Sequence, residues 1–124
     1  MSPVQELIQR VFCSRNIAHL THWKTSSYAE HIALGDFYDG VVDQLDSFIE
    51  KYQAAFGLIT FKEDEEAEEK EEAKKDIIPL LQDDVKWISK NRSKIAREVP
   101  ALENVLDELV GFYLQTIYKL KFLT

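Results

Sequence analysis

The sequence predicts an all-α protein, folded as an antiparallel four-helix bundle with one long crossover connection. Four successive stretches repeat their apolar residues every three or four positions, the spacing that places them on one face of a helix. The chain has only four Gly and three Pro in 124 residues, too few for the frequent turns of an all-β protein. All connections between the stretches are short except one, and short connections are typical of antiparallel neighbours in a bundle.

The first helix is expected to run from Pro3 to about Trp23. Ser2 precedes it, and proline is tolerated at the first helical position because its missing N–H would have no partner there. Residues 25–27 then interrupt the pattern. The predicted buried stripe consists of Val4, Leu7, Ile8, Val11 and Phe12.

The second helix has the strongest apolar pattern of the chain. Ser27 can cap it, with Glu30 completing a capping box. Phe56 is its expected last residue, since Gly57 is a good residue for ending a helix. Its apolar positions are Leu34, Phe37, Tyr38, Val41, Leu45, Phe48, Tyr52 and Phe56.

The second half of the chain holds the long connection and two more helices. The apolar run 58–61 is expected to dock on the bundle, and the Glu- and Lys-rich segment 62–76 is predicted to be a solvated connector or a frayed helix. A third helix begins near Ile77 and ends before Pro100. A fourth runs from about Leu102 to the C-terminal residues.

Composition and charge exclude several classes of protein. Fifteen Lys and Arg against twenty-two Asp and Glu give a net charge of −7, which argues against a basic nucleic-acid binder and a polybasic membrane anchor. The single Cys13 excludes an internal disulfide and a Cys-rich zinc site, and its amphipathic surroundings predict an inert thiol. No secretory signal and no apolar run of roughly 18 residues is visible. We expect one cytoplasmic domain over residues 1–124, with neither nucleic acid nor membrane as a partner.

The titratable residues of the second helix are the first candidates for a site, because no phosphate loop, nucleophile elbow or H-E-x-x-H motif occurs. Four acidic residues, spaced four, three and four apart, share one side of this helix: Asp39, Asp43, Asp46 and Glu50. Asp46 lies beside the apolar arc and is expected to be half buried. Asp39 and Asp43 are expected to face water.

His31 lies on the same border of the helix, about four turns before Asp46. One imidazole and two carboxylates suit iron, manganese or zinc. The two residues are fifteen positions apart, which is roughly 22 Å along a helix. They cannot bind one ion within a single chain, so a metal site would need another helix or another copy of this one.

The residues His22-Trp23, His31, Asp46 and Glu50 resemble the motif of the Dps family of ferritin-like mini-ferritins, and the chain looks most like short phage-type members of it. In that family a His-Trp pair ends the first helix, a second His opens the second, and an Asp-x-x-x-Glu pair follows. The resemblance implies a ferritin-like fold and an iron site at a two-fold dimer interface. It implies that His22 and His31 come from one subunit and Asp46 and Glu50 from the other, with ferroxidase activity using oxygen or peroxide.

The chain departs from the family's pattern at one ligand position. Gly35 stands where an acidic ligand often follows the second His, so Asp36 or Asp39 would have to substitute. The chain also has no Lys-rich N-terminal tail of the kind with which some members condense DNA.

A second hypothesis assigns these residues no metal. His22 would then pack at the helix end, His31 would bond a carboxylate, and His19 is expected to be a surface or packing residue in either case. The protein would be a non-catalytic helical-bundle oligomer of ferritin-like fold that binds a protein partner or a small molecule. Both hypotheses predict a homodimer or a higher homo-oligomer.

Overall fold

The computed structural model describes residues 1–61 and 76–124, and this part of the chain is helical with no β-strand. Its helices are α1 (Pro3–Lys24), α2 (Tyr28–Phe56), α4 (Ile77–Ala96) and α5 (Pro100–Phe122). The all-α four-helix prediction is confirmed. The fourth helix begins two residues earlier than expected, at the proline itself. The predicted acidic connector lies outside the described residues, apart from its last residue, Asp76.

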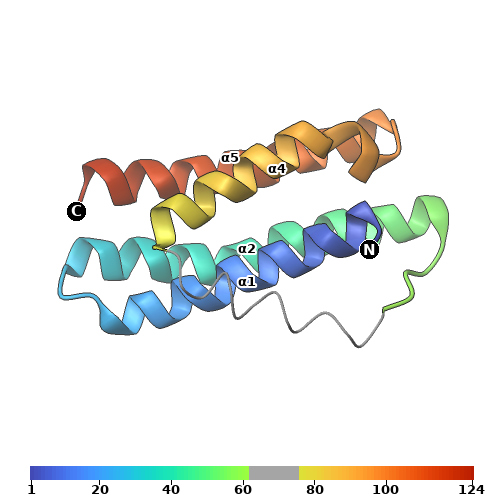
Figure 1. Cartoon of the computed structure of the whole chain (residues 1–124). Coiled ribbons are helices and arrows are strands. Elements are labelled where there is room, and N and C mark those ends of the chain that lie inside the picture. Colours follow the sequence, from blue (N-terminus) through green and yellow to red (C-terminus); the bar gives the residue numbers. More distant parts are fainter. Residues whose placement is uncertain (62–75) are drawn as a thin grey trace.

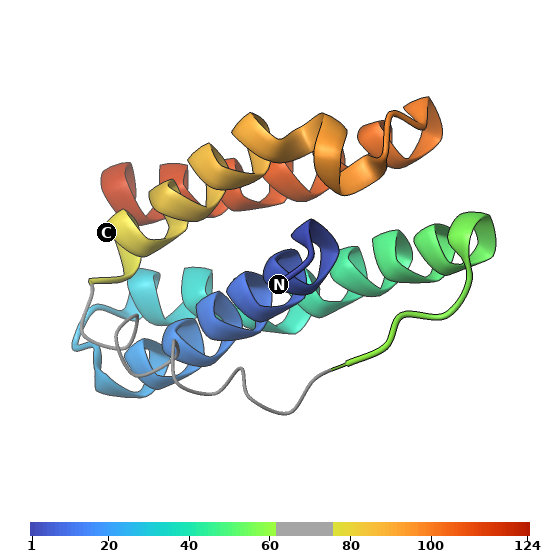
Figure 2. The same cartoon turned by 45° about the vertical axis from the view of Figure 1, so that its right-hand side comes forward.

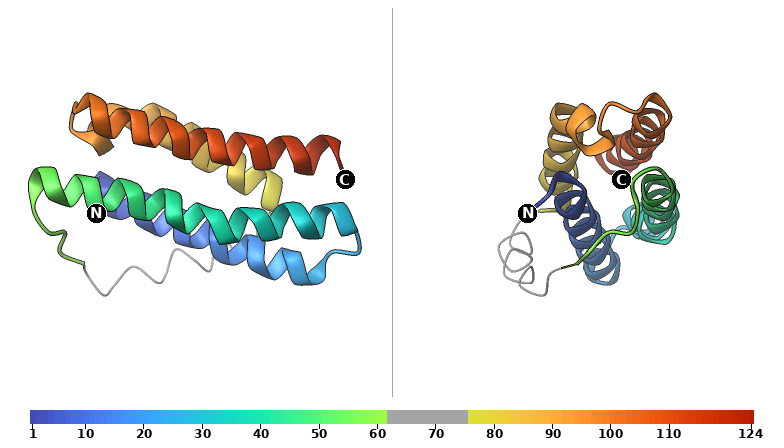
Figure 3. Two further views of the ribbon diagram at one scale, coloured as in Figure 1. Left: turned by 180° about the vertical axis from the view of Figure 1, so that it is seen from behind. Right: turned by 90° about the vertical axis from the view of Figure 1, so that its right-hand side faces the viewer.

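Each helix packs against two neighbours in the ring order α1, α2, α5, α4, and the end-on view in Figure 3 shows the four around a common centre. Neighbouring helices run antiparallel in both side views (Figures 1 and 2). α2 and α4 lie on a diagonal and run parallel, so α2 ends and α4 begins at opposite ends of the bundle. The connection between them is therefore the predicted long crossover.

Local caps determine where the first two helices begin and end. The Ser2 hydroxyl accepts a hydrogen bond from the Gln5 amide, and the Gln5 side chain accepts one from the Ser2 amide, both at 3.3 Å. Ser27 accepts from the Glu30 amide at 3.2 Å, as predicted for the N-cap of α2. The predicted capping box is wrong, because the Ser27 amide donates to Thr25 Oγ1 at 3.1 Å and not to the Glu30 side chain. Gly57 ends α2 with φ at +95°, a conformation that glycine adopts far more readily than other residues.

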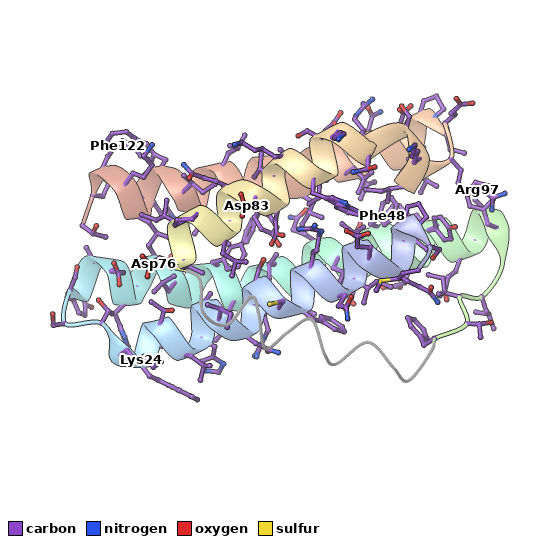
Figure 4. The ribbon with its side chains drawn as sticks, viewed as in Figure 1. Lys24, Phe48, Asp76, Asp83, Arg97 and Phe122 are labelled. Atoms are coloured by element: carbon purple, nitrogen blue, oxygen red, sulfur yellow. The ribbon has the colours of Figure 1, made fainter. Side chains whose placement is uncertain are left out.

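Apolar side chains from all four helices meet along the bundle axis. The prediction that Phe12 belongs to the buried stripe of α1 is wrong, since its side chain is 45% exposed. Phe48 points between the helices in Figure 4 and is fully buried, and Cys13 is buried as well. Of the run 58–61, Ile59 packs on the core while Leu58 and Phe61 are exposed, so this run docks only in part. The other large, fully buried side chains are Tyr113, Phe37, Leu7, Leu34, Leu45, Leu80, Leu81, Ile88, Ile95, Leu106 and Leu109.

None of the described helices is long and apolar enough to cross a membrane.

Candidate functional site

Two histidines lock the end of α1 to the start of α2. The rings of His22 and His31 stack with centroids 3.6 Å apart and planes 16° apart. Nδ1 of His22 lies 2.6 Å from the carbonyl oxygen of His31, and Nδ1 of His31 lies 2.7 Å from the carbonyl oxygen of His22. A carbonyl oxygen only accepts, so both Nδ1 atoms carry a proton and donate it. In the neutral rings both Nε2 atoms therefore keep the lone pair that a metal ion needs.

The first turns of α2 also enclose the His22 ring. A Cβ atom on Gly35 would lie 3.2 Å from Cε1 and 3.4 Å from Nδ1 of this ring, so the glycine leaves the space that the imidazole occupies. Tyr38 meets the ring edge-on, with centroids 5.2 Å apart and planes 80° apart. His22 and His31 are both half-buried, so each residue keeps part of its surface accessible.

His19 continues this ring packing along the contact between α1 and α2. Its ring stacks on Tyr38 with centroids 3.9 Å apart and planes 14° apart, and its centroid lies 4.4 Å from that of Trp23. The Arg15 guanidinium lies 5.5 Å from the centre of the Tyr38 ring. His19 is thus a packing residue, in agreement with the prediction.

The predicted carboxylate ligands lie on the outer face of α2, where Asp46 and Glu50 are exposed. The prediction that Asp46 is half buried is wrong. Asp46 follows the fully buried Phe37 by nine residues, which places it about 180° around the helix. Asp39 and Asp43 are exposed as expected. Within residues 1–61 and 76–124, no group of three or more His, Cys, Asp or Glu side chains could hold a metal ion, so a single copy does not bring the four predicted ligands together.

A second polar cluster, absent from the sequence prediction, lies in the bundle core. Asp84 of α4 is 1% exposed and accepts hydrogen bonds from Arg10 Nη1, at 3.2 Å, and from the Ser14 hydroxyl. Arg10 Nε also donates to Glu6, at 3.0 Å. Burial raises the pKa of Tyr113 well above its usual value, and the negative charge of Asp84 raises it further. Since Arg10 already compensates the Asp84 charge, we assign this cluster a structural role.

The comparison with known families assigns the chain to one family. A family model described as "Family of unknown function (DUF5856)" matches residues 22–120. The chain belongs to this family. The DUF5856 match begins at His22, so all four predicted ligands lie within the matched residues. No curated protein and no solved structure matches the chain.

Proposed function

We propose that a dimer of this chain binds iron, or a similar divalent metal, between His22 and His31 of one copy and Asp46 and Glu50 of the other. The observation that carries the proposal is the reciprocal pair of hydrogen bonds from Nδ1 to a backbone carbonyl. A metal-ligating histidine almost always donates its second ring N–H to a carbonyl, a carboxylate or water, which determines its tautomer and orients its ring. Here the fold supplies that support to both rings.

A second copy is part of the proposal because the ligands are far apart in one chain. His31 and Asp46 lie on the same helix, with roughly 22 Å between them along its axis. When two α2 helices pair antiparallel about a two-fold axis, the His31 end of one meets the Asp46 end of the other. Two equivalent sites then form, one at each end of the pair.

The outer face of α2 suits this pairing because its two ends differ in character. The first turns expose Tyr28 and Ile32, which are 79% and 43% accessible, beside the histidines. The second half exposes Asp46 and Glu50. Antiparallel pairing sets Asp46 and Glu50 of one copy against imidazoles and apolar side chains of the other, while Asp39 and Asp43 lie between the two ends. A divalent cation bound there would offset the negative charge of Asp46 and Glu50.

The donor set determines the chemistry that the site can support. Imidazole nitrogen and carboxylate oxygen are ligands that iron, manganese and zinc accept. We include oxidation of Fe²⁺ in the proposal: iron is the substrate, each ion gives up one electron, and dioxygen or peroxide is the acceptor. A ferritin-like domain over residues 1–124 and a cytoplasmic location belong to the same proposal.

Mixed dimers test whether the site is shared between copies. His31→Ala and Asp46→Ala should each abolish binding of Fe²⁺. When the two variants are unfolded together and refolded, one site of each mixed dimer carries both lesions and the other carries neither. About a quarter of the wild-type sites should return, because random pairing makes half of the dimers mixed. As a control, His22→Ala mixed with His31→Ala should restore none, since every site then lacks one histidine. Failure of the first mixture to recover binding, with mixed dimers shown to form, would refute the shared site.

A second candidate function, binding of a protein or a small molecule without metal, is favoured by an exposed apolar row on α5. Leu114, Tyr118 and Phe122 follow one another at intervals of four residues and are 50%, 54% and 69% exposed. Contiguous exposed apolar surface is typical of interaction sites. The row adjoins a groove between α4 and α5 lined by Ile88, Ser89, Arg92, Leu106, Asp107, Val110, Gly111 and Leu114. Purified protein that binds no Fe²⁺ and dimerises normally would favour this candidate.

A further inference from the structure

Gly35 occupies a position where the helix itself gives no reason for glycine. It lies in the interior of α2 with an ordinary helical backbone, since among the described glycines only Gly57 has a positive φ. Glycine inside a helix costs roughly 0.5–1 kcal/mol relative to alanine. Gly111, inside α5, has no atom within 4 Å of where its Cβ would be. At Gly35 a Cβ would instead lie in tight contact with the ring of His22, 3.2 Å from Cε1.

We propose that Gly35 is a positioning residue of the metal site. It leaves the slot in which the His22 ring lies with Nδ1 toward the His31 carbonyl and Nε2 available to the metal. This inference rests on the proposed function for its effect on metal binding, although the positioning of the ring can be measured without any metal.

The His22 ring cannot easily yield to a larger side chain at position 35. It is stacked on His31 at 3.6 Å, held by the 2.6 Å hydrogen bond from Nδ1, and bordered by the edge of Tyr38. A methyl group at 3.2 Å from Cε1 and 3.4 Å from Nδ1 would push the ring by a few tenths of an ångström and so disturb the hydrogen bond from Nδ1. Hydrogen bonds prefer a donor–hydrogen–acceptor angle above about 150°, so such a displacement weakens the bond.

The experiment compares Gly35→Ala with the matched control Gly111→Ala in the full chain. Histidine ¹⁵N spectra of the metal-free protein at neutral pH should show the Nδ1–H tautomer for His22 and His31 in the wild type and in the control. In Gly35→Ala we expect the ¹⁵N chemical shifts of the His22 ring to change. Co²⁺, used as a spectroscopic probe, should then bind about ten to a hundred times more weakly, as for other changes to the groups that support a metal ligand. Co²⁺ affinity of the control should equal that of the wild type.

A double mutant separates the role of the slot from a general effect on folding. In the His22→Ala background the slot is empty, so Gly35→Ala should raise the unfolding midpoint by the same amount as Gly111→Ala raises it. If alanine at position 35 lowers the midpoint even without the imidazole, the inference is wrong.

The outcomes also distinguish this inference from the proposed function. A wild-type protein that binds no Co²⁺, together with altered ¹⁵N chemical shifts of the His22 ring in Gly35→Ala, would refute the metal site and leave the positioning of the ring intact. Unchanged spectra and unchanged Co²⁺ affinity in Gly35→Ala would overturn the positioning role and leave the metal site standing.

Discussion

The ion pair between Arg10 and Asp84 makes a strong prediction about stability, because it joins α1 to α4 inside the bundle. The Asp84 side chain is 2% exposed and that of Arg10 is 28% exposed, with 3.2 Å between Nη1 and Oδ1. Removing one member of a buried pair leaves the other charge desolvated and uncompensated. Arg10→Met should therefore destabilise the protein far more than loss of one surface charge would.

The magnitude follows from the burial of each partner. Breaking a buried pair costs about 3–5 kcal/mol, and we expect about 3 for Arg10→Met because water reaches the pair from the side of the arginine. Asp84→Asn should cost about 2 kcal/mol, since it removes the charge from the hydrogen bonds of Arg10 and Ser14 but retains a polar group. Each single variant already breaks the same interaction, so the double variant should cost about 1–2 kcal/mol less than the sum.

Urea unfolding followed by circular dichroism measures this cycle, at one fixed protomer concentration because dimerisation would shift the apparent stability. The matched control is the cycle of Arg92→Met and Asp107→Asn. That pair has bonds of 2.7 and 2.8 Å, but its side chains are 37% and 53% exposed. Solvent screens exposed pairs, so the control should show much the smaller coupling. Additive effects of Arg10→Met and Asp84→Asn, within about 0.3 kcal/mol, would contradict the assigned role of the cluster.

Three further outcomes are expected. Tyr113 keeps its proton in the folded state above pH 10.0, which is the ordinary pKa of tyrosine, whereas the unfolded chain releases the proton there. The free energy of unfolding should therefore fall with rising pH by up to about 1.4 kcal/mol per pH unit. Tyr113→Phe should remove this component in alkaline urea titrations. Gly40→Ala should cost about 1–3 kcal/mol in thermal or urea unfolding, because its Cβ would lie 2.5 Å from Cζ of Phe112. With a net charge of −7, the protein should not shift DNA in a gel at physiological salt, and a persistent shift would contradict the expected absence of nucleic acid as a partner.

The sequence predicts the fold well because the signals for the helices are local. Ser2, Ser27 and Gly57 act within one turn of the helix ends that they mark, and each apolar stripe is readable from its own helix. The same local patterns do not predict that Asp84 is buried. This aspartate lies three residues after Leu81 and four before Ile88, the spacing of a core position. However, the adjacent pair Asp83 and Asp84 suggests a solvated face unless the distant partner of Asp84 is known.

In the candidate site, too, some features are predicted by spacing along one helix and others depend on the tertiary fold. Spacing along α2 indicates His31, Asp46 and Glu50, yet the stacking of His22 on His31 depends on the path of the chain through residues 25–27, which spacing does not describe. The reason for Gly35 is likewise invisible in the sequence, since the ring that it accommodates belongs to α1. Asp46 is exposed because the fully buried residues Phe37, Val41 and Phe48 lie on the opposite side of α2 from it.

The crossover also determines how the bundle would respond to a mechanical load. Because α1 and α5 run in the same direction, the first residue of α1 and the last residue of α5 lie at opposite ends of the molecule (Figure 1). A force applied between them acts along the helix axes. The helices would have to slide past one another, loading several contacts at once, instead of separating one turn at a time as in a hairpin pulled open from one end. An optical-tweezers experiment with handles at these two positions should therefore meet higher resistance than one with handles at Pro3 and Phe56, which lie at the same end of the bundle.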